Sequence, residues 1–471
     1  MGAARAAAAR TPVRGAAAAL RHDAHGYWLA EAGGVSSPAP SLAGDATADV
    51  VVIGGGYTGL WTAWQLRERG ASVAVLEADL CGHGPSGRNG GFCETLWTQL
   101  PSLVERLGRE RALAVCRASA ESVGAIGAWC EAQGVDAWFR RAGFMLASTA
   151  PAHDAVLDEI LAVAPRDRVQ PLDGAALRAR CASPRFRRGL FVPDDATVQP
   201  ARLALGLRER LLDVIHERSR VRALHAAPRE VVAETAQGRV RAGAAVLAIN
   251  AATRGFRPLR HRLSVTSSHI VLTEPVPEVL EEIGWTGGEC ITDARTFVHY
   301  FRTTRDGRIA FGWGGGRLAP GARLGGRIEV DPDVAAQTRE HLVAMFPQLA
   351  GRAVTHAWGG PIDVSPSHLP QIGTLEGAPV HYAFGFTGNG VGPSHLAGRI
   401  LAARASGEPT DLGIDHVPVR VPPEPFAMLG GSLVRRAFLR KERLEEAGAD
   451  ADPLTRALTA APRALGIHVA R

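Results

Sequence analysis

The sequence predicts an α/β fold with an α+β part: a Rossmann-like domain, into which a second domain built on a mixed or antiparallel β-sheet is inserted. A glycine-rich turn near residue 54 joins a buried strand to a helix, an acidic residue ends the next strand, and a second glycine-rich turn precedes a helix near residue 390. Strand and hairpin signals lie between the two turns, so we expect both turns to belong to one discontinuous domain. With 471 residues the chain is long enough for two domains.

The start of the chain predicts no folded unit. Residues 1–45 are rich in Ala, Gly and Pro, and we expect a disordered N-terminal extension with residues 38–40 as a linker. The first residues lack a compact apolar stretch with a cleavage site, which disfavours a signal peptide. No segment approaches the roughly 20 apolar residues that a membrane helix needs. We therefore expect a cytoplasmic protein with no integral membrane segment.

Residues 50–77 carry the pattern of a dinucleotide-binding unit. After a buried strand, Gly54 turns the chain, Gly56 lets backbone amides approach a pyrophosphate, and Gly59 lets the next helix pack on the strand. The helix N-terminus carries roughly half a positive charge, which suits phosphate. Glu77 ends the following strand, where its carboxylate can accept hydrogen bonds from ribose hydroxyls. The candidate cofactor-binding residues of this unit are Gly54, Gly56, Tyr57, Thr58, Gly59, Glu77 and Ala78.

A second match to the same glycine spacing carries no weight. Gly82, Gly84 and Gly87 follow no strand and enclose Pro85, so we discard them as a fingerprint. The first match has strand, helix, strand and acid in order. It leaves open which dinucleotide binds, since nicotinamide and flavin cofactors share the pattern.

The rest of the chain alternates helix and strand signals. Helical patterns cover residues 103–113 and 123–130, and Pro200 fits the first turn of another helix. Asp306-Gly307 is a strong signal for a two-residue hairpin turn. The segments expected to be strands are 230–234, 244–249, 296–304 and 308–313.

These patterns divide the chain into two domains and a tail. We assign residues 46–100, 195–255 and 353–410 to the discontinuous nucleotide-binding domain. Residues 101–194 and 256–352 form the expected substrate domain. Residues 411–471 are expected to be a C-terminal tail with a short basic helix at 433–444 that packs on the surface.

The charged and sulfur-containing residues exclude several classes of protein. Lys441, in the tail, is the single lysine among 53 basic residues, which excludes a Schiff-base lysine or a lysine above a flavin from the body of the chain. The arginines are scattered among 47 acids, so the net charge of +6 does not predict a nucleic-acid partner. The six cysteines form no C-x-x-C pair and no metal-ligand spacing, so we expect reduced thiols and no metal.

Four motifs together resemble the D-amino-acid-oxidase-type flavoproteins. They are the fingerprint at 50–77, Ser-Gly-Arg-Asn-Gly-Gly at 86–91, Trp-Gly-Gly-Pro at 358–361 with Pro-Gln-Ile-Gly at 370–373, and Gly-Phe-Thr-Gly-Asn-Gly at 385–390. The loop at 86–91 is most similar to that of the gamma-glutamylputrescine oxidase group. The resemblance spans about residues 46–410 and implies FAD, a Rossmann-like flavin domain and a mixed sheet above the isoalloxazine ring. It also implies oxidation of a C–N bond in an amine or amino acid.

The resemblance assigns further cofactor contacts. It implies that Glu77 binds ribose, that residues 88–91 contact pyrophosphate or flavin, and that Val221 lies beside adenine. Backbone amides at 388–391, before the helix that follows, can donate to the flavin C2 carbonyl region. The additional candidate FAD contacts are Ser86, Arg88, Asn89, Gly90, Gly91, Val221, Trp358, Gly388, Asn389, Gly390 and Val391.

Three departures from the family pattern bear on chemistry. Some relatives attach flavin through a histidine whose slot here is Arg88, with His83 offset, so we expect non-covalent FAD. The lysine that activates oxygen in sarcosine oxidases corresponds to Ala310. A second lysine, which holds the substrate carboxylate in those enzymes, corresponds to Gly392, which favours an amine over a simple α-amino acid.

Candidate substrate or catalytic residues lie on the hairpin and on the strand before the last motif. Tyr300, Trp313 and Arg302 are hairpin candidates, although aromatic residues on a hairpin can equally be core. His356 is a candidate whose alternative is a structural histidine. Asp363 is expected to bind a substrate ammonium or to cap a turn.

The predicted function is an FAD-dependent amine or amino-acid oxidoreductase that transfers a hydride to flavin N5, with O₂ or another acceptor reoxidising the flavin. The alternative is an NAD(P)H-dependent flavin monooxygenase, whose later Gly-Asp motif is replaced here by Gly-Asn-Gly-Val. A nucleic-acid-modifying flavoprotein and a disulfide reductase fit less well, since the chain has neither a basic domain nor a redox C-x-x-C. We expect a monomer or homodimer.

Overall fold

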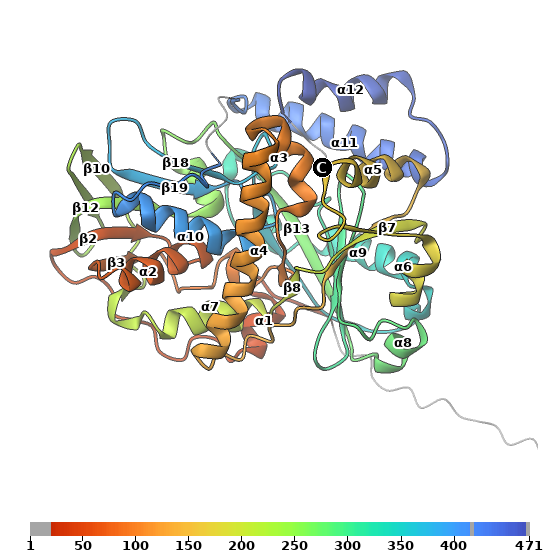
Figure 1. The fold of residues 1–471 in the computed structure, drawn as a ribbon, viewed down its shortest axis with the longest axis horizontal. Helices are drawn as coiled ribbons and strands as arrows, with labels where there is room; N and C mark the ends of the chain where they lie inside the picture. The colour runs from red at the N-terminus through yellow and green to blue at the C-terminus, as the bar shows by residue number, and fades with distance from the viewer. Residues whose placement is uncertain (1–19, 415–418, 468–471) are drawn as a thin grey trace, which may run out of the picture.

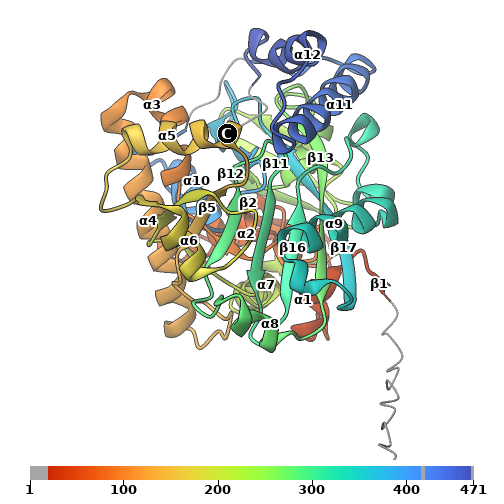
Figure 2. The same cartoon turned by 90° about the vertical axis from the view of Figure 1, so that its right-hand side faces the viewer.

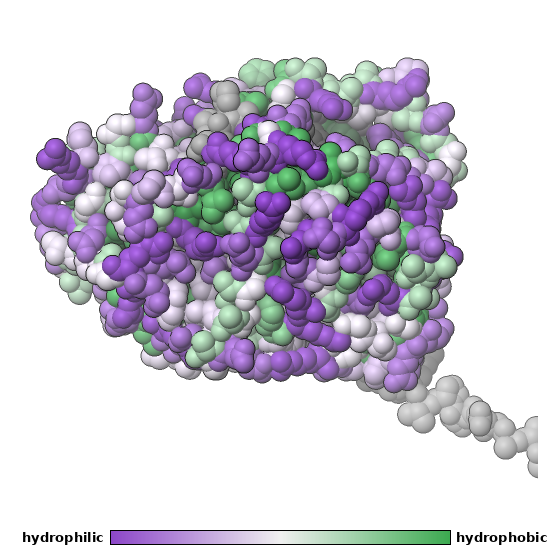
Figure 3. Space-filling view, in the orientation of Figure 1, coloured by the Kyte–Doolittle hydropathy of each residue, from purple (hydrophilic) through white to green (hydrophobic). Residues whose placement is uncertain are grey.

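The computed structural model describes residues 20–414 and 419–467. Two β-sheets lie side by side, with helices on their outer faces and α11 (Phe426–Glu446) and α12 (Pro453–Ala464) along one edge (Figures 1 and 2). The face in Figure 1 is mostly hydrophilic, with apolar side chains gathered in its upper half (Figure 3). Within the described residues, none of the helices has the length and hydropathy needed to cross a bilayer.

The first sheet is Rossmann-like, as predicted. Its parallel strands run in the order β19, β12, β2, β3, β9, because the chain leaves each strand through a helix or a long crossover before it returns. Strands β10 and β11 extend it as an antiparallel meander, and β18 pairs with β19. The strands are β2 (Ala46–Ile53), β3 (Val73–Leu76), β9 (Ile215–His216), β10 (Ala223–Ala227), β11 (Glu230–Glu234), β12 (Arg239–Leu247), β18 (Gln371–Thr374) and β19 (Val380–Phe384).

The second sheet has nine strands and is mixed, with parallel pairs β1–β17 and β14–β5 and antiparallel pairs elsewhere. Its order is β1 (Arg21–His22), β17 (Val354–Val364), β13 (Ser264–Thr273), β16 (Ile309–Trp313), β15 (His299–Thr303), β14 (Cys290–Asp293), β5 (Phe144–Ser148), β7 (Arg188–Val192) and β6 (Gln170–Leu172). The β15–β16 hairpin confirms the predicted pairing. Its turn is longer than predicted, because Thr304 N–H donates to Arg308 O across three residues that include Gly307 at φ +73°.

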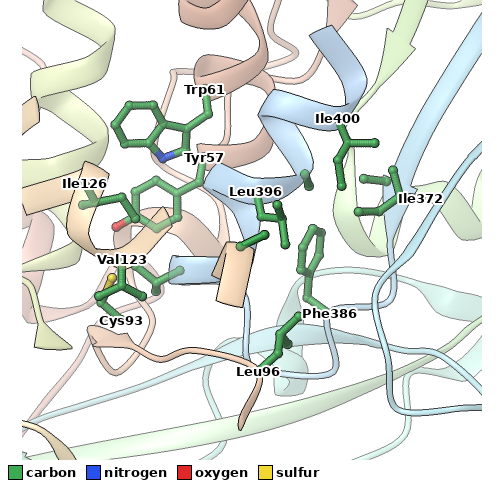
Figure 4. Close-up of a cluster of buried hydrophobic side chains, with 14 of the residues drawn as sticks. Tyr57, Trp61, Cys93, Leu96, Val123, Ile126, Ile372, Phe386, Leu396 and Ile400 are labelled. Carbon is green, nitrogen blue, oxygen red and sulfur yellow. The ribbon is translucent and has the colours of Figure 1, made fainter. Parts of the chain in front are cut away.

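Helices cover both sheets. Helices α2 (Tyr57–Glu68), α10 (Val391–Ala405) and α4 (Arg109–Ala132) pack together, and their apolar side chains form the cluster in Figure 4. Thus α4 lies against the Rossmann-like helices, although we assigned its residues to the substrate domain. The other helices are α1 (Gly26–Glu31), α3 (Leu100–Leu107), α5 (Asp154–Val163), α6 (Gly174–Arg180), α7 (Pro200–Glu209), α8 (Pro277–Glu282) and α9 (Pro332–Met345); strands β4 (Phe92–Cys93) and β8 (Ala196–Thr197) pair separately.

Three segments differ from the sequence-based expectation. Residues 20–45 contain β1 and α1, and Trp28 and Leu29 are buried, so this part of the expected extension is folded; residues 1–19 lie outside the described residues. Strand β17 belongs to the second sheet, although we assigned residues 353–410 to the nucleotide-binding domain. The expected short helix at 433–444 is the later part of a 21-residue helix, α11, and α12 follows it.

Candidate functional site

One cavity of about 1300 Å³ lies between the two sheets and is lined by both. Its walls include the turn after β2, the loop at 86–91, the end of β12, the β15–β16 hairpin and the turn before α10. Ordinary small-molecule pockets hold about 300–1,000 Å³. This volume therefore suits a ligand of dinucleotide size together with a substrate.

The early glycine turn has the geometry that the sequence predicts. Gly54 has φ +110°, and a Cβ there would lie 2.4 Å from Ala248 O. A Cβ on Gly59 would lie 1.9 Å from Gly54 O, so only glycine allows α2 to start this close to β2. Helix α2 begins at Tyr57, and its N-terminal residues line the cavity. The Tyr57 side chain points away, into the core, where its hydroxyl donates to Pro200 O at 2.7 Å (Figure 4).

Glu77 lies at the end of β3 on the cavity wall. One carboxylate oxygen accepts the Gly55 N–H at 2.6 Å and the other accepts the Asp79 N–H at 2.8 Å. Burial raises the pKa of Glu77, and these backbone N–H groups act against that rise. Each oxygen keeps a lone pair for a further donor, which is what a ribose hydroxyl offers. Ala78 and Val221 line the same part of the cavity.

The loop at 86–91 is held rigidly beside α2. Ser86 Oγ accepts the Tyr57 N–H at 2.9 Å, and Asn89 Nδ2 donates to Ser86 O at 2.9 Å. Asn89 Oδ1 accepts the Gly91 N–H at 2.7 Å. Arg88 is 8 % exposed and forms an ion pair of 2.8 Å with Glu329, while Trp358 Nε1 donates to Arg88 O at 2.8 Å. The loop therefore presents a fixed backbone to the cavity, and Ser86, Arg88, Asn89, Gly90 and Trp358 line it.

The late turn presents a helix N-terminus from the opposite side. Gly388 has φ +88°, and α10 starts at Val391 after the N-cap Gly390. The side chain of Asn389 is buried, and neither its oxygen nor its nitrogen finds a hydrogen-bond partner within the described residues. Buried polar atoms of this kind are normally hydrogen-bonded, and a ligand bound in the cavity would supply partners for them.

Asp363 on β17 holds this late turn in place. Its carboxylate accepts the Gly385 N–H at 2.5 Å, and its carbonyl accepts the Thr387 N–H at 3.2 Å. Burial raises the pKa of Asp363 to about 7. Of the two expected roles, the contacts fit turn capping, although Asp363 also lines the cavity.

The two turns share one cavity, as predicted. Helices α2 and α10 approach so closely at Gly398 that a Cβ there would lie 2.7 Å from Trp61 Cβ. Residues at the N-terminus of α2 (56–58) and at the N-terminus of α10 (388–391) both line this cavity. The glycine turns, the carboxylate of Glu77 and the unpaired Asn389 amide fit a dinucleotide with a polar ring at its far end.

The substrate end of the cavity is formed by the second sheet. The Tyr300 hydroxyl lies 2.7 Å from Ser268 Oγ on β13, and burial raises the pKa of Tyr300 to about 12, so this phenol stays protonated at neutral pH. Phe92 packs edge-on against Tyr300, with ring centroids 5.8 Å apart. Ser268, Phe92 and Glu94 line the cavity but were not predicted. No sequence motif marks Ser268. Side chains alternate between the two faces of a strand, so the alternation along β13 is the signal that could have identified Ser268 as inward-facing.

Three of the substrate or catalytic candidates do not line this cavity, and neither do the cofactor candidates Gly59 and Gly91. Trp313 pairs with His299 in the hairpin register, so its ring lies on the opposite face from Tyr300 and packs on His341 with a centroid distance of 4.8 Å. The His356 ring packs on Tyr27 with a centroid distance of 5.1 Å, outside the cavity. Arg302 is buried and donates to Gly91 O at 3.1 Å, which ties the hairpin to the 86–91 loop.

Known proteins resemble this chain in sequence and in structure. The family model described as FAD dependent oxidoreductase matches residues 49–404. Gamma-glutamylputrescine oxidoreductase of Escherichia coli (strain K12) is 30% identical over 383 residues, which cover 79% of this chain and 87% of that protein. The probable oxidoreductase OrdL of Rhizobium meliloti (strain 1021) is 27% identical over 419 residues, covering 85% and 91%.

Solved structures share the fold at lower identity. The glycine oxidase from Geobacillus kaustophilus aligns with a TM-score of 0.62 and 20% identity over 78% of this chain and 96% of that one. The L-amino acid deaminase from Proteus vulgaris aligns with a TM-score of 0.64 and 17% identity over 84% and 99%. The match over most of the chain, together with the cavity geometry, shows that this protein belongs to the DAO family of FAD-dependent oxidoreductases.

Proposed function

We propose that the protein oxidises a C–N bond of a small amine or amino acid in this cavity. When bound, FAD supplies a hydride acceptor at N5, and the oxidised substrate is an imine that water hydrolyses to a carbonyl compound and an amine or ammonia. The observation that carries the proposal is the single cavity shared by the two glycine turns and the Tyr300 side of the second sheet. The substrates in the names of the relatives, gamma-glutamylputrescine and glycine, are of this chemical class.

The residues of the Rossmann-like sheet would hold FAD along the cavity. The first turn of α2 would bind the pyrophosphate, Glu77 the ribose, and Val221 the adenine side. The N-terminus of α10 and the Asn389 amide would donate to the polar edge of the flavin, where negative charge develops on reduction.

We propose non-covalent attachment of the cofactor. Arg88 occupies the slot of the linking histidine in some relatives, and its guanidinium is already engaged by Glu329 and by Ala24 O. His83 lines the cavity, where burial lowers its pKa. Neither Arg88 nor the offset His83 replaces the histidine through which those relatives attach their flavin.

The second sheet would orient the substrate. Tyr300 and Ser268 offer hydroxyl groups at fixed positions, and Ile270 of the same sheet, with Phe92 of the separate strand β4, supplies apolar walls that exclude water. The substrate amine reacts as its neutral form, so the site needs to position its nitrogen lone pair more than to supply a strong base. Ala310, at the position of the oxygen-activating lysine, packs in an apolar cluster with Trp28 and Leu272, so this position supplies no cation for oxygen.

Anaerobic mixing tests the proposal. The FAD-loaded protein is mixed with a panel of polyamines, acylated diamines, aminophosphonates and amino acids while the absorbance of oxidised flavin is followed. Bleaching by an amine and none by NADPH is the expected result. Bleaching by NADPH alone would favour a flavin monooxygenase instead. Air is then admitted, and prompt recolouring with peroxide would identify O₂ as the acceptor.

A further inference from the structure

The C-terminal helices α11 and α12 form part of the cavity wall, although they follow the last residue that the family model matches, 404. Both helices lie along the upper edge of the molecule in two perpendicular views (Figures 1 and 2). The side chains that they contribute to the wall are mostly apolar. They include Leu433, Val434, Leu458 and Pro462, with Arg435 among them.

A buried ion pair fixes α11 to the substrate sheet. Glu442 is 1 % exposed and lies 3.1 Å from Arg295, which precedes β15. The same carboxylate accepts the Phe297 N–H at 2.7 Å, and Phe297 lines the cavity. Since a buried ion pair with a further hydrogen bond is costly to break, α11 is a fixed part of this wall rather than a loose tail.

Arg435 is a cation on this wall whose charge has no direct partner. One terminal nitrogen donates to Gly315 O, between the cavity-lining residues Gly314 and Gly316. Its Nε is buried without a hydrogen-bond partner, and no carboxylate of the described residues lies within 4.0 Å of the guanidinium. The charge of opposite sign that acts on the pKa of Arg435 is that of Asp331, whose oxygens are already engaged by Arg317 and Arg327.

Burial of this guanidinium opposes its charge. Desolvation lowers the pKa of Arg435, and the neighbouring Arg317 and Arg436 act in the same direction. An anion placed between the cavity and Arg435 would relieve both effects. A guanidinium presents a planar set of N–H donors that matches a carboxylate in two-point contact.

We propose that Arg435 and the apolar side chains of α11 and α12 form a subsite for an anionic group of the substrate, remote from the C–N bond that reacts. The subsite selects an amine that carries a carboxylate at the far end of an apolar spacer. Arg435 recognises the carboxylate, and Leu433, Val434 and Leu458 contact the spacer. The oxidation step rests on the proposed function, whereas carboxylate binding does not.

The test uses two probes that differ in their charged end. Calorimetric titration of the FAD-loaded protein with hexanoate and with hexylamine measures binding without requiring any oxidation. Arg435→Gln is expected to raise the Kd of hexanoate by about 10- to 100-fold, because a hydrogen-bonded charge contributes about 1.5–3 kcal/mol. The Kd of hexylamine is expected to change by less than about 2-fold. Arg436→Gln, on an exposed neighbour in the same helix, is the matched control for the loss of one charge and should change either Kd by less than about 2-fold.

Three results would overturn the proposal: no binding of hexanoate by the unaltered protein, an unchanged hexanoate Kd in Arg435→Gln, or an equal loss for both probes. If Arg435→Gln does not fold, Arg435→Lys keeps the charge without two-point contact, and a rise in the hexanoate Kd alone is expected. Kinetics with 6-aminohexanoate then separate the two proposals. Failure to bleach flavin with intact hexanoate binding contradicts only the proposed oxidation.

Discussion

Replacing Gly56 by valine tests whether the first turn of α2 binds the pyrophosphate, and it should leave the fold intact. Gly56 has φ −83°, an ordinary value for any residue, and the nearest neighbour of an added Cβ is Ser86 Oγ at 3.0 Å. The free energy of unfolding of the apoprotein should therefore change by only about 1 kcal/mol. A branched side chain at the start of α2 would keep the pyrophosphate from the backbone N–H groups. Loss of two charge-assisted hydrogen bonds, at about 1.5–3 kcal/mol each, weakens FAD binding by roughly 10²- to 10⁴-fold.

The assay is titration of apoprotein with FAD, followed by quenching of flavin fluorescence, with thermal unfolding of the apoprotein measured in parallel. Gly124→Ala is the control, because its Cβ would meet only the flexible end of Arg141 at 3.2 Å and Gly124 does not line the cavity. Gly59→Ala should instead damage the fold itself, since its Cβ would lie 1.9 Å from Gly54 O. Unchanged FAD affinity in Gly56→Val would refute the proposal that the first turn of α2 binds the pyrophosphate.

Three further predictions concern the core and the cavity. Glu217→Gln removes the buried carboxylate that lies 2.7 Å from the Arg208 guanidinium and leaves only the half-exposed Glu209 as its counter-charge, so it should lower the free energy of unfolding by about 3 kcal/mol in denaturant titrations. Because burial raises the pKa of Asp363 to about 7, the folded state keeps a proton that the unfolded chain releases above about pH 4. The free energy of unfolding of the apoprotein should therefore fall by up to about 1.4 kcal/mol per pH unit as pH rises towards 7. Asp363→Asn should flatten that slope, and an equal slope in both proteins would contradict the raised pKa of Asp363. Tyr300→Phe should slow flavin reduction by an active amine in stopped flow, whereas Trp313→Phe should leave it within about 2-fold, and the reverse order would contradict the assigned sheet faces.

The Rossmann-like domain was predictable because its signals are local. Gly54, Gly59 and Glu77 lie within one strand–helix–strand unit, so their spacing alone determines which atoms meet. The convergence of the early and late turns could be predicted in the same way, since each turn joins a strand of the Rossmann-like sheet to the helix that follows it. The cavity lining confirms this arrangement.

The substrate side was harder to predict because it depends on which face of a strand points inward. Tyr300 and Trp313 lie on adjacent strands, and only the register, with His299 opposite Trp313, places them on opposite faces. His356 is on a strand that we expected in the other domain, and its ring packs under α1.

The two ends of the chain contain more folded structure than predicted, because their amino-acid composition suggested little. Trp28 and Leu29 are buried within a segment whose Ala, Gly and Pro content predicted disorder, because tertiary contacts with Trp358 outweigh weak local propensity. In α11, Gly430 and Gly431 lower the helix propensity of the first turns. The helix forms because its later residues are anchored to the substrate sheet.

Reconstitution with FAD tests the central claim most directly. Apoprotein titrated with FAD should take up one equivalent with a saturable change in flavin absorbance, and acid precipitation should release all of the flavin into the supernatant. Gly56→Val should lose this uptake while keeping its fold. A protein that binds no FAD, or that retains the flavin in the acid pellet, would contradict a cofactor held by the two turns through contacts alone.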